Sequence, residues 1–408
     1  MKKLKIIYKI VLFCVLYVGG QSLIKYAVLD DTLTISRMMM HDLYTEDNID
    51  ILFCGASHCQ LGIDPEVMDA GFNRNTFNAG SSSQGLETSL ALIKEAEKYH
   101  DLQEIYVDLD YSIVMRELPN LESIYIVSDY MKPSLNKISF LLNATSFDYY
   151  VNSFMPLHKG RGYTKNPREI LRILNRKNTP EYRDYLVADP SYAGKGHIAS
   201  QTVMGEGTLW FKGNLEQENF DIPTQQQEYL REIISFCNEK DIHLTFVSLP
   251  VTDFHLEIMQ NYDDYVAAVN KFLDGTGISY YDFNLCNPAY LDLQYDGYYN
   301  DDNHLNTYGA KVFGKVFTDF FTGKIDKTEL FCESYSEKRT LCIPRVLGIV
   351  IDKGMKPDCE EIQVKPIANT KELVVDCEVI KVDGGYRIMA TVDGNLTNEV
   401  EIKDEELR

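Results

Sequence analysis

Apolar runs alternate with amphipathic segments along most of the chain. The runs typical of buried strands lie at 50–56, 75–80, 104–110, 242–250 and 278–284. Segments with apolar residues at helical spacing lie at 86–100, 225–241, 262–277 and 307–323. Strands separated by helices of this length indicate a parallel sheet covered by helices on both faces. The pattern predicts an α/β domain in which ligands bind at the carboxyl ends of the strands.

The N-terminal segment has a different pattern. It opens with four lysines, Lys2, Lys3, Lys5 and Lys9, and its apolar character continues to about Leu29. We interpret residues 6–28 as one membrane-spanning helix, interrupted by cationic side chains that can snorkel to the headgroups. The basic flank is expected to stay cytoplasmic, which places the rest of the chain outside the cell membrane. A cleaved signal peptide and a buried helix of a cytosolic protein remain alternatives, although no clear cleavage site follows the apolar run.

Two regions depart from the strand–helix alternation. Residues 112–225 are rich in Tyr, Asn, Pro and basic residues and contain the single tryptophan, Trp210. This mostly helical insertion either covers the site and shapes a substrate groove or forms a surface subdomain. Short alternating runs from about Lys327 predict a small all-β module, a sandwich. The predicted organisation is an anchor at 1–30, an α/β domain at 31–325 and a β module at 326–408.

Charge and cysteine content narrow the choice of partners. The net charge of −21 argues against nucleic acid, since binding a phosphate backbone requires a basic surface. The nine cysteines are scattered without metal-ligand spacing, and His158, His197 and His255 have no partner at such spacing. We therefore expect no metal or other cofactor. Cys54 and Cys237 are expected to be core residues. The last four cysteines could pair if the compartment is oxidising: Cys332, Cys342, Cys359 and Cys377.

Two stretches carry candidate chemistry. In "ILFCGASHCQLGIDP" (51–65), a strand followed by Gly-x-Ser and a helix exposes Ser57 at the carboxyl edge of the sheet, where backbone N–H groups can face an oxyanion. Cys59 is a weaker candidate nucleophile because it lies two positions further on, inside the helix. His58 is expected to line the pocket or to form a local hydrogen bond, because an adjacent residue seldom reaches its neighbour's hydroxyl.

The second stretch is "YYNDDNHLNTYGAKVF" (298–313), at the entry of the last predicted helix. Asp301 precedes His304 by three residues, so one loop can present a base and the carboxylate that orients it. Asp302 could compete with Asp301 for this role. Asn303 or Asn306 could instead cap the helix that follows.

The order of these motifs resembles the SGNH (GDSL-like) hydrolase superfamily. The resemblance covers roughly residues 48–112 and 225–323, and "DDNHLNTYGA" is its most specific block. The chain is most similar to the membrane-anchored branch that includes DltD-type proteins and the alginate and peptidoglycan O-acetylation proteins. The resemblance implies a flavodoxin-like three-layer domain, with Ser57 as nucleophile, His304 as general base and Asp301 as its orienting carboxylate.

The same resemblance implies an oxyanion hole formed by the N–H groups of Ser57 and Gly80. The family's third block normally adds an asparagine, but this chain has Asp108 and Asp110 in "VDLDYS". A carboxylate repels an oxyanion unless it is protonated or points away. The hole is therefore incomplete or completed by a substitute, for which the candidates are Ser82, Ser83 and Gln84.

These observations predict a membrane-anchored, extracytoplasmic serine acyltransferase or esterase. Its substrate would be the O-acyl groups, most simply O-acetyl, of a cell-envelope glycan, and the resemblance implies a multi-spanning membrane acyltransferase as partner. The altered third block keeps a second class open, in which the domain binds glycans or acts in assembly without catalysis. A secreted lipase-like esterase is a third reading, but no lid-like apolar helix supports it.

Overall fold

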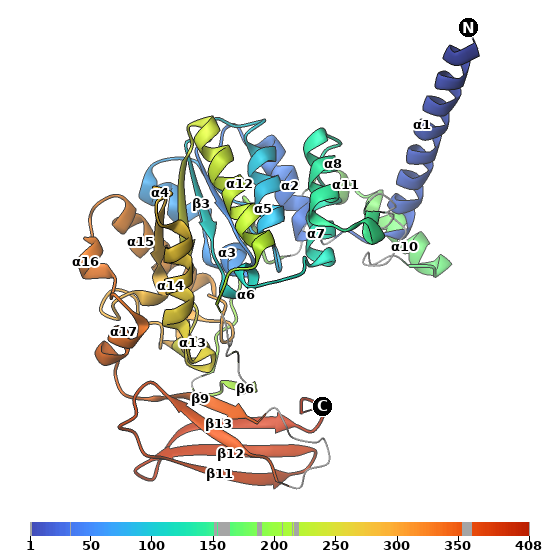
Figure 1. Cartoon of the computed structure of the whole chain (residues 1–408). Coiled ribbons are helices and arrows are strands. Elements are labelled where there is room, and N and C mark those ends of the chain that lie inside the picture. The colour runs from blue at the N-terminus through green and yellow to red at the C-terminus, as the bar shows by residue number, and fades with distance from the viewer. Residues whose placement is uncertain are drawn as a thin grey trace.

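The chain has a central parallel sheet between helical layers, a long helix projecting at one side and a β module below (Figure 1). The computed structural model describes all residues except 1, 33, 151–152, 154–163, 186–189, 206, 214, 216–219, 353–360 and 408. His158 and Cys359, which were considered above, lie outside the described residues.

The central sheet has five strands in the order β2-β1-β3-β7-β8, all parallel. They are β1 (Ile51–Cys54), β2 (Thr76–Asn78), β3 (Glu104–Asp108), β7 (His243–Ser248) and β8 (Ser279–Asp282). This is the order of flavodoxin-like doubly wound sheets, and it confirms the predicted fold class. Because the winding reverses between β1 and β3, the carboxyl ends of these two strands border the crevice where such folds bind ligands.

Alternate strand residues face opposite helical layers, as the two-residue period of a strand requires. Leu52 and Cys54 pack toward α2 (Ile35–Thr45), α5 (Leu86–Ala96), α12 (Thr224–Lys240) and α14 (Tyr262–Leu273). Ile51 and Phe53 pack on the other face, toward α3 (Ser57–Gly62), α4 (Pro65–Phe72) and α15 (Thr307–Phe321). The Phe53 ring stacks on Tyr106 and meets Phe317 edge-on. Both faces of the sheet are therefore covered.

The N-terminal helix α1 (Lys2–Val28) projects from the body (Figure 1). Residues 5–28 are long and apolar enough to cross a membrane, and the apolar stretch is not buried inside the protein. This agrees with the predicted apolar helix at 6–28.

The insertion is mostly helical in its described part. Its helices are α6 (Tyr111–Val114), α7 (Leu121–Ser128), α8 (Leu135–Ala144), the 3-10 helix η1 (Phe147–Tyr149), α10 (Pro167–Lys177) and α11 (Pro180–Arg183). Helices α7 and α8 pack on α2 and α5, which places them against a helical layer of the sheet. The short strands β4 (Tyr192–Gly194) and β5 (His197–Ile198) approach the site elements instead, since His197 Nδ1 lies 3.2 Å from the carbonyl oxygen of Gln60.

The C-terminal module consists of two three-stranded sheets around a shared core. Its strands are β9 (Val346–Ile351), β10 (Val364–Ala368), β11 (Val375–Val382), β12 (Gly385–Val392) and β13 (Asn395–Lys403). The sixth strand is β6 (Trp210–Lys212), which comes from the insertion and pairs with β9 in parallel. The expected β module thus includes three residues from far upstream.

The strands of this module begin later than the sequence pattern suggested. Residues from Lys327 form two short helices, α16 (Lys327–Leu330) and α17 (Tyr335–Leu341), because Asp326 and Ser334 cap them. Lys338 of α17 is fully buried and pairs with Asp253 at 2.5 Å. The other short elements are α13 (Asp253–Met259), η2 (Phe283–Leu285) and η3 (Asp296–Tyr298). The ion pair between Lys338 and Asp253 therefore attaches helix α17 to α13 of the α/β domain.

Candidate active site

A glycine turn brings Ser57 to the carboxyl edge of the sheet. A Cβ atom on Gly55 would lie 2.6 Å from the Cβ of Asp108 and 2.8 Å from that of Cys59. Only glycine allows the ends of β1 and β3 to approach this closely. Ala56 is the N-cap of α3, and Ser57 is its first residue. The first N–H groups of a helix have no acceptor within it, so the Ser57 hydroxyl lies beside orphan backbone donors.

His304 joins Ser57 to Asp301. Its Nε2 lies 2.7 Å from Ser57 Oγ, and its Nδ1 lies 3.0 Å from Oδ2 and 3.1 Å from Oδ1 of Asp301. Asp301 Oδ1 also accepts the backbone N–H groups of Asn303 and His304, at 3.0 and 2.9 Å. The loop before α15 thus holds the carboxylate on the imidazole before any substrate arrives. This geometry meets the distances that a nucleophile, a general base and a carboxylate that orients the base require.

Neighbouring residues of this loop have other roles. Burial opposes the ionisation of Asp301, but hydrogen bonds from His304 and Asn303 hold its pKa below the usual value. Asp302 faces away and lies 2.8 Å from Nδ1 of His255, so it does not compete for His304. Asn306 is the residue that caps α15, accepting the N–H of Gly309 at 2.9 Å.

A second histidine–carboxylate pair, not foreseen from the sequence, lies beside the first. His58 Nδ1 is 2.6 Å from Asp110 Oδ2, both side chains are buried, and the ring of His58 meets that of His304 edge-on at 5.1 Å. Burial disfavours the charged imidazole, but the charge and hydrogen bond of Asp110 raise the pKa of His58 to about 9. Burial likewise opposes the charge on Asp110, yet His58 and Ser112 hold its pKa well below the usual range. Both shifts of pKa favour the ionised form of the pair at neutral pH.

Asp108 completes this buried cluster. Its Oδ1 accepts the N–H of Leu249 at 3.0 Å, whereas Oδ2 is buried without a hydrogen-bond partner among the described residues. Burial raises the pKa of Asp108 to about 7, with His58 lowering it and Asp110 raising it. Near neutral pH a large share of Asp108 is therefore protonated, which reduces the repulsion that a carboxylate here would exert on an oxyanion.

The other residues predicted for the oxyanion hole form no hydrogen bond with Ser57 in the described structure. The N–H of Gly80 donates to Asn78 Oδ1 at 2.9 Å and is already engaged. Ser82 and Ser83 are exposed, and no hydrogen bond joins them to Ser57 in the described structure. Gln84 is buried and bonded to Ser81 and Ser89. A role for Gly80, Ser82 or Ser83 in an oxyanion hole stays a prediction.

Cys59 is placed as a packing residue. Its side chain is buried, and its Sγ lies 3.4 Å from Oδ1 of Asn78. Burial raises the pKa of this thiol well above its usual value, so it holds almost no reactive thiolate at neutral pH. Of the last four cysteines, Cys332, Cys342 and Cys377 are free thiols.

Comparisons with known proteins leave the family open. No family model matches the chain, and a search of curated proteins finds no match. Among solved structures, the chain is similar to one described provisionally as a platelet activating factor from Streptococcus pneumonia. The match covers 70% of this chain and 90% of the other at 13% identity, with a TM-score of 0.32. A similarity with a TM-score this low does not indicate the function of this chain.

Proposed function

We propose that the chain is a serine-dependent acyl-transferring enzyme. The observation that carries this proposal is the contact of 2.7 Å between Ser57 Oγ and His304 Nε2, with Asp301 on the other imidazole nitrogen. In the proposed cycle, His304 takes the proton of Ser57 while Oγ attacks the acyl carbonyl. His304 then returns this proton to the departing alcohol. Water or a second hydroxyl group next attacks the acyl-serine, with His304 again as base.

Charge stabilisation in this proposal comes from two sources. In this proposal the N–H groups at the start of α3, including that of Ser57, would donate to the oxyanion. The His58–Asp110 pair, which carries both charges and so has no net charge, would add an oriented dipole beside the reacting centre. Such fixed charges act strongly in a buried site because little water screens them.

The proposed substrate is an O-acyl group, most simply O-acetyl, of a cell-envelope glycan. The support is the apolar helix α1, which would hold the domain at a membrane surface, and the motif resemblance to membrane-anchored SGNH proteins. In that setting the domain lies outside the cytoplasm and receives its acyl group from a multi-spanning membrane acyltransferase. The motifs alone do not distinguish transfer to a sugar from transfer to water.

A second function is favoured by one observation. The N–H of Gly80, which the family resemblance assigns to the oxyanion hole, is bonded to Asn78. A domain whose hole is incomplete would bind an acylated glycan, or act in assembly, without turning it over.

Covalent labelling separates the two functions. The full chain in neutral detergent is treated with a fluorescent fluorophosphonate at pH 6 to 9. We expect labelling of the wild type and of Ser82→Ala, an exposed neighbouring serine, and none of Ser57→Ala. No labelling of the wild type at any of these pH values would favour the non-catalytic function. Envelope acetyl content in cells with and without the gene then separates the reactions, since its loss indicates a transferase and its gain an esterase.

A further inference from the structure

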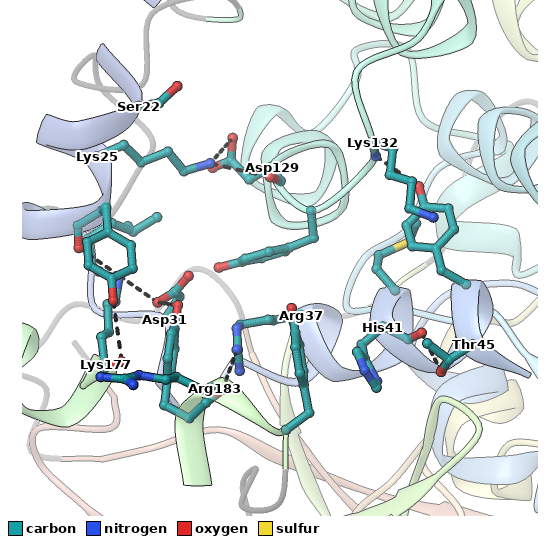
Figure 2. A pocket seen from close by; sticks show the side chains of 17 residues that line it. Ser22, Lys25, Asp31, Arg37, His41, Thr45, Asp129, Lys132, Lys177 and Arg183 are labelled. Atoms are coloured by element: carbon teal, nitrogen blue, oxygen red, sulfur yellow. Dashed lines mark hydrogen bonds and ion pairs between the residues drawn. The ribbon is translucent and has the colours of Figure 1, made fainter. Parts of the chain in front are cut away.

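A cavity of about 700 Å³ lies where helix α1 meets the α/β domain, away from Ser57. Residues from α1, α2, α10 and α11 line it together with the segments that follow α1, α7 and α11. In Figure 2, Lys25 and Asp129 lie on one side of the cavity, and Asp31, Lys177 and Arg183 on another. If α1 crosses a membrane as proposed above, its C-terminal end and this cavity lie at the outer headgroup layer.

The lining is basic in an acidic protein. Five Lys or Arg side chains border the cavity against two aspartates, whereas the whole chain carries a net charge of −21. The two aspartates are each occupied, Asp129 by Lys25 at 3.0 Å and Asp31 by Lys177 at 2.7 Å. Three cations remain without a carboxylate partner among the described residues: Arg37, Lys132 and Arg183.

Arg37 is the most informative of these three. It is 6% exposed, and its guanidinium lies between the rings of Tyr182 and Tyr185, 3.8 and 3.9 Å from their centroids. One Nη group donates to the carbonyl oxygen of Tyr182 at 2.7 Å, and within the described part of the chain the other has the sulfur of Met38, at 4.0 Å, as its hydrogen-bond acceptor. A guanidinium has five N–H donors. Burying such a charge without a counter-ion is costly, so the arrangement favours an anion in the cavity.

The cavity is also fixed relative to the end of α1. Lys177 of α10 donates to the carbonyl oxygens of Tyr26 and Leu29, at 3.0 and 2.6 Å. It thereby holds the last turn of the helix to the domain. A ligand bound here would keep a constant position relative to the membrane surface.

We propose that this cavity binds a phosphate-bearing group, with the anionic headgroup of a membrane lipid as its source. Arginine forks and lysine ammonium groups are the side chains that recognise phosphate, and the aromatic rings fit the apolar part of a headgroup region. The lipid source rests on the proposed membrane anchoring but not on the serine chemistry.

The test uses the full chain in dodecyl maltoside micelles. Its thermal midpoint is followed while dihexanoyl phosphatidate, dihexanoyl phosphatidylcholine or inorganic phosphate is added. A ligand that binds the folded state stabilises it by RT ln(1 + L/Kd), where L is the free ligand concentration, so the rise of the midpoint with ligand concentration gives the Kd. The variant is Lys132→Gln/Arg183→Gln, which changes two exposed residues. The matched control is Lys381→Gln/Lys403→Gln, which removes two exposed lysines of the β module.

We expect saturable phosphatidate binding that is about 30-fold weaker in the cavity variant and unchanged in the control. Arg37→Lys keeps the charge but loses the fork, and it should also weaken binding. Equal affinity for the choline lipid, or equal loss in both double variants, would overturn the site. Inorganic phosphate binding as tightly as the lipid would overturn the lipid source. Repeating the titration with Ser57→Ala separates this result from the proposed function, since cavity binding should persist when labelling is lost.

Discussion

The ionised His58–Asp110 pair makes the stability of the domain depend on pH in a calculable way. The pKa of His58 rises from 6.5 to about 9 on folding. The contribution of His58 to the free energy of unfolding is therefore complete below pH 6.5 and is lost as the pH rises through about 9. Between pH 7.5 and 9.5 this loss amounts to about 2 kcal/mol, from 1.36 kcal/mol for each pKa unit. Asp108 changes stability in the same direction, but its change is nearly complete by about pH 7.

The assay is the thermal midpoint of the full chain in neutral detergent, measured from pH 6 to 9.5. A change of 2 kcal/mol corresponds to a fall of about 3 °C, since the entropy of unfolding is about 2.1 cal/mol/K per residue and the domain has roughly 300 residues. His58→Gln should remove most of the fall between pH 7.5 and 9.5. The matched control is His243→Gln, which changes an exposed histidine near Glu104 and should leave the fall intact. If His58→Gln and His243→Gln show the same pH dependence as the wild type, the pair is not ionised and the reasoning is refuted.

Three further predictions follow from the site and its supports. Asp301→Ala should be labelled by the fluorophosphonate about 10²-fold faster than His304→Ala, although more slowly than the wild type, because the base remains but loses its orientation. Equal labelling rates in the two variants would remove Asp301 from the proposed triad. Gly55→Ala should cost about 1–3 kcal/mol by overpacking, whereas Gly62→Ala, whose new Cβ would meet its nearest neighbour at 3.4 Å, should cost far less; equal thermal midpoints would contradict the close approach. Lys338→Met leaves Asp253 buried and unpaired, and urea unfolding should show a loss of about 3–5 kcal/mol that replacing both residues by apolar ones largely restores.

Much of the fold could be predicted because the periodic patterns of apolar and polar residues along the chain are long and regular. Strand β1 around Leu52 is wholly apolar, as expected for a strand buried on both faces, and the helices show clear amphipathic spacing. Helix α17 and strand β6 were missed because seven and three residues are too short to establish a period. The parallel pairing of Trp210 with Ile349 cannot be read from either segment alone.

In the candidate site, too, some residues could be predicted from the sequence and others could not. Ser57, Asp301 and His304 could be proposed from the Gly-x-Ser turn, the Asp-x-x-His loop and the resemblance of their order to a known family, and the structure brings the three side chains together. The pairing of His58 with Asp110 was missed because the two residues are 52 positions apart and carry no motif. A usable signal did exist, since each follows one of two strands that became neighbours. The engagement of Gly80 by Asn78 depends on side-chain geometry that sequence does not encode in any simple pattern.

Strand β6 has a consequence for how the chain is made. It emerges from the ribosome more than 130 residues before β9, the strand with which it pairs. Until then Trp210 and Phe211 have no sheet to join, and an unpaired strand is prone to wrong partners. The β module can complete its core only after its last strand, β13, has been made. A fragment beginning at Val346 would lack this strand and should fold poorly when produced alone. The β module is therefore not an independently folding domain.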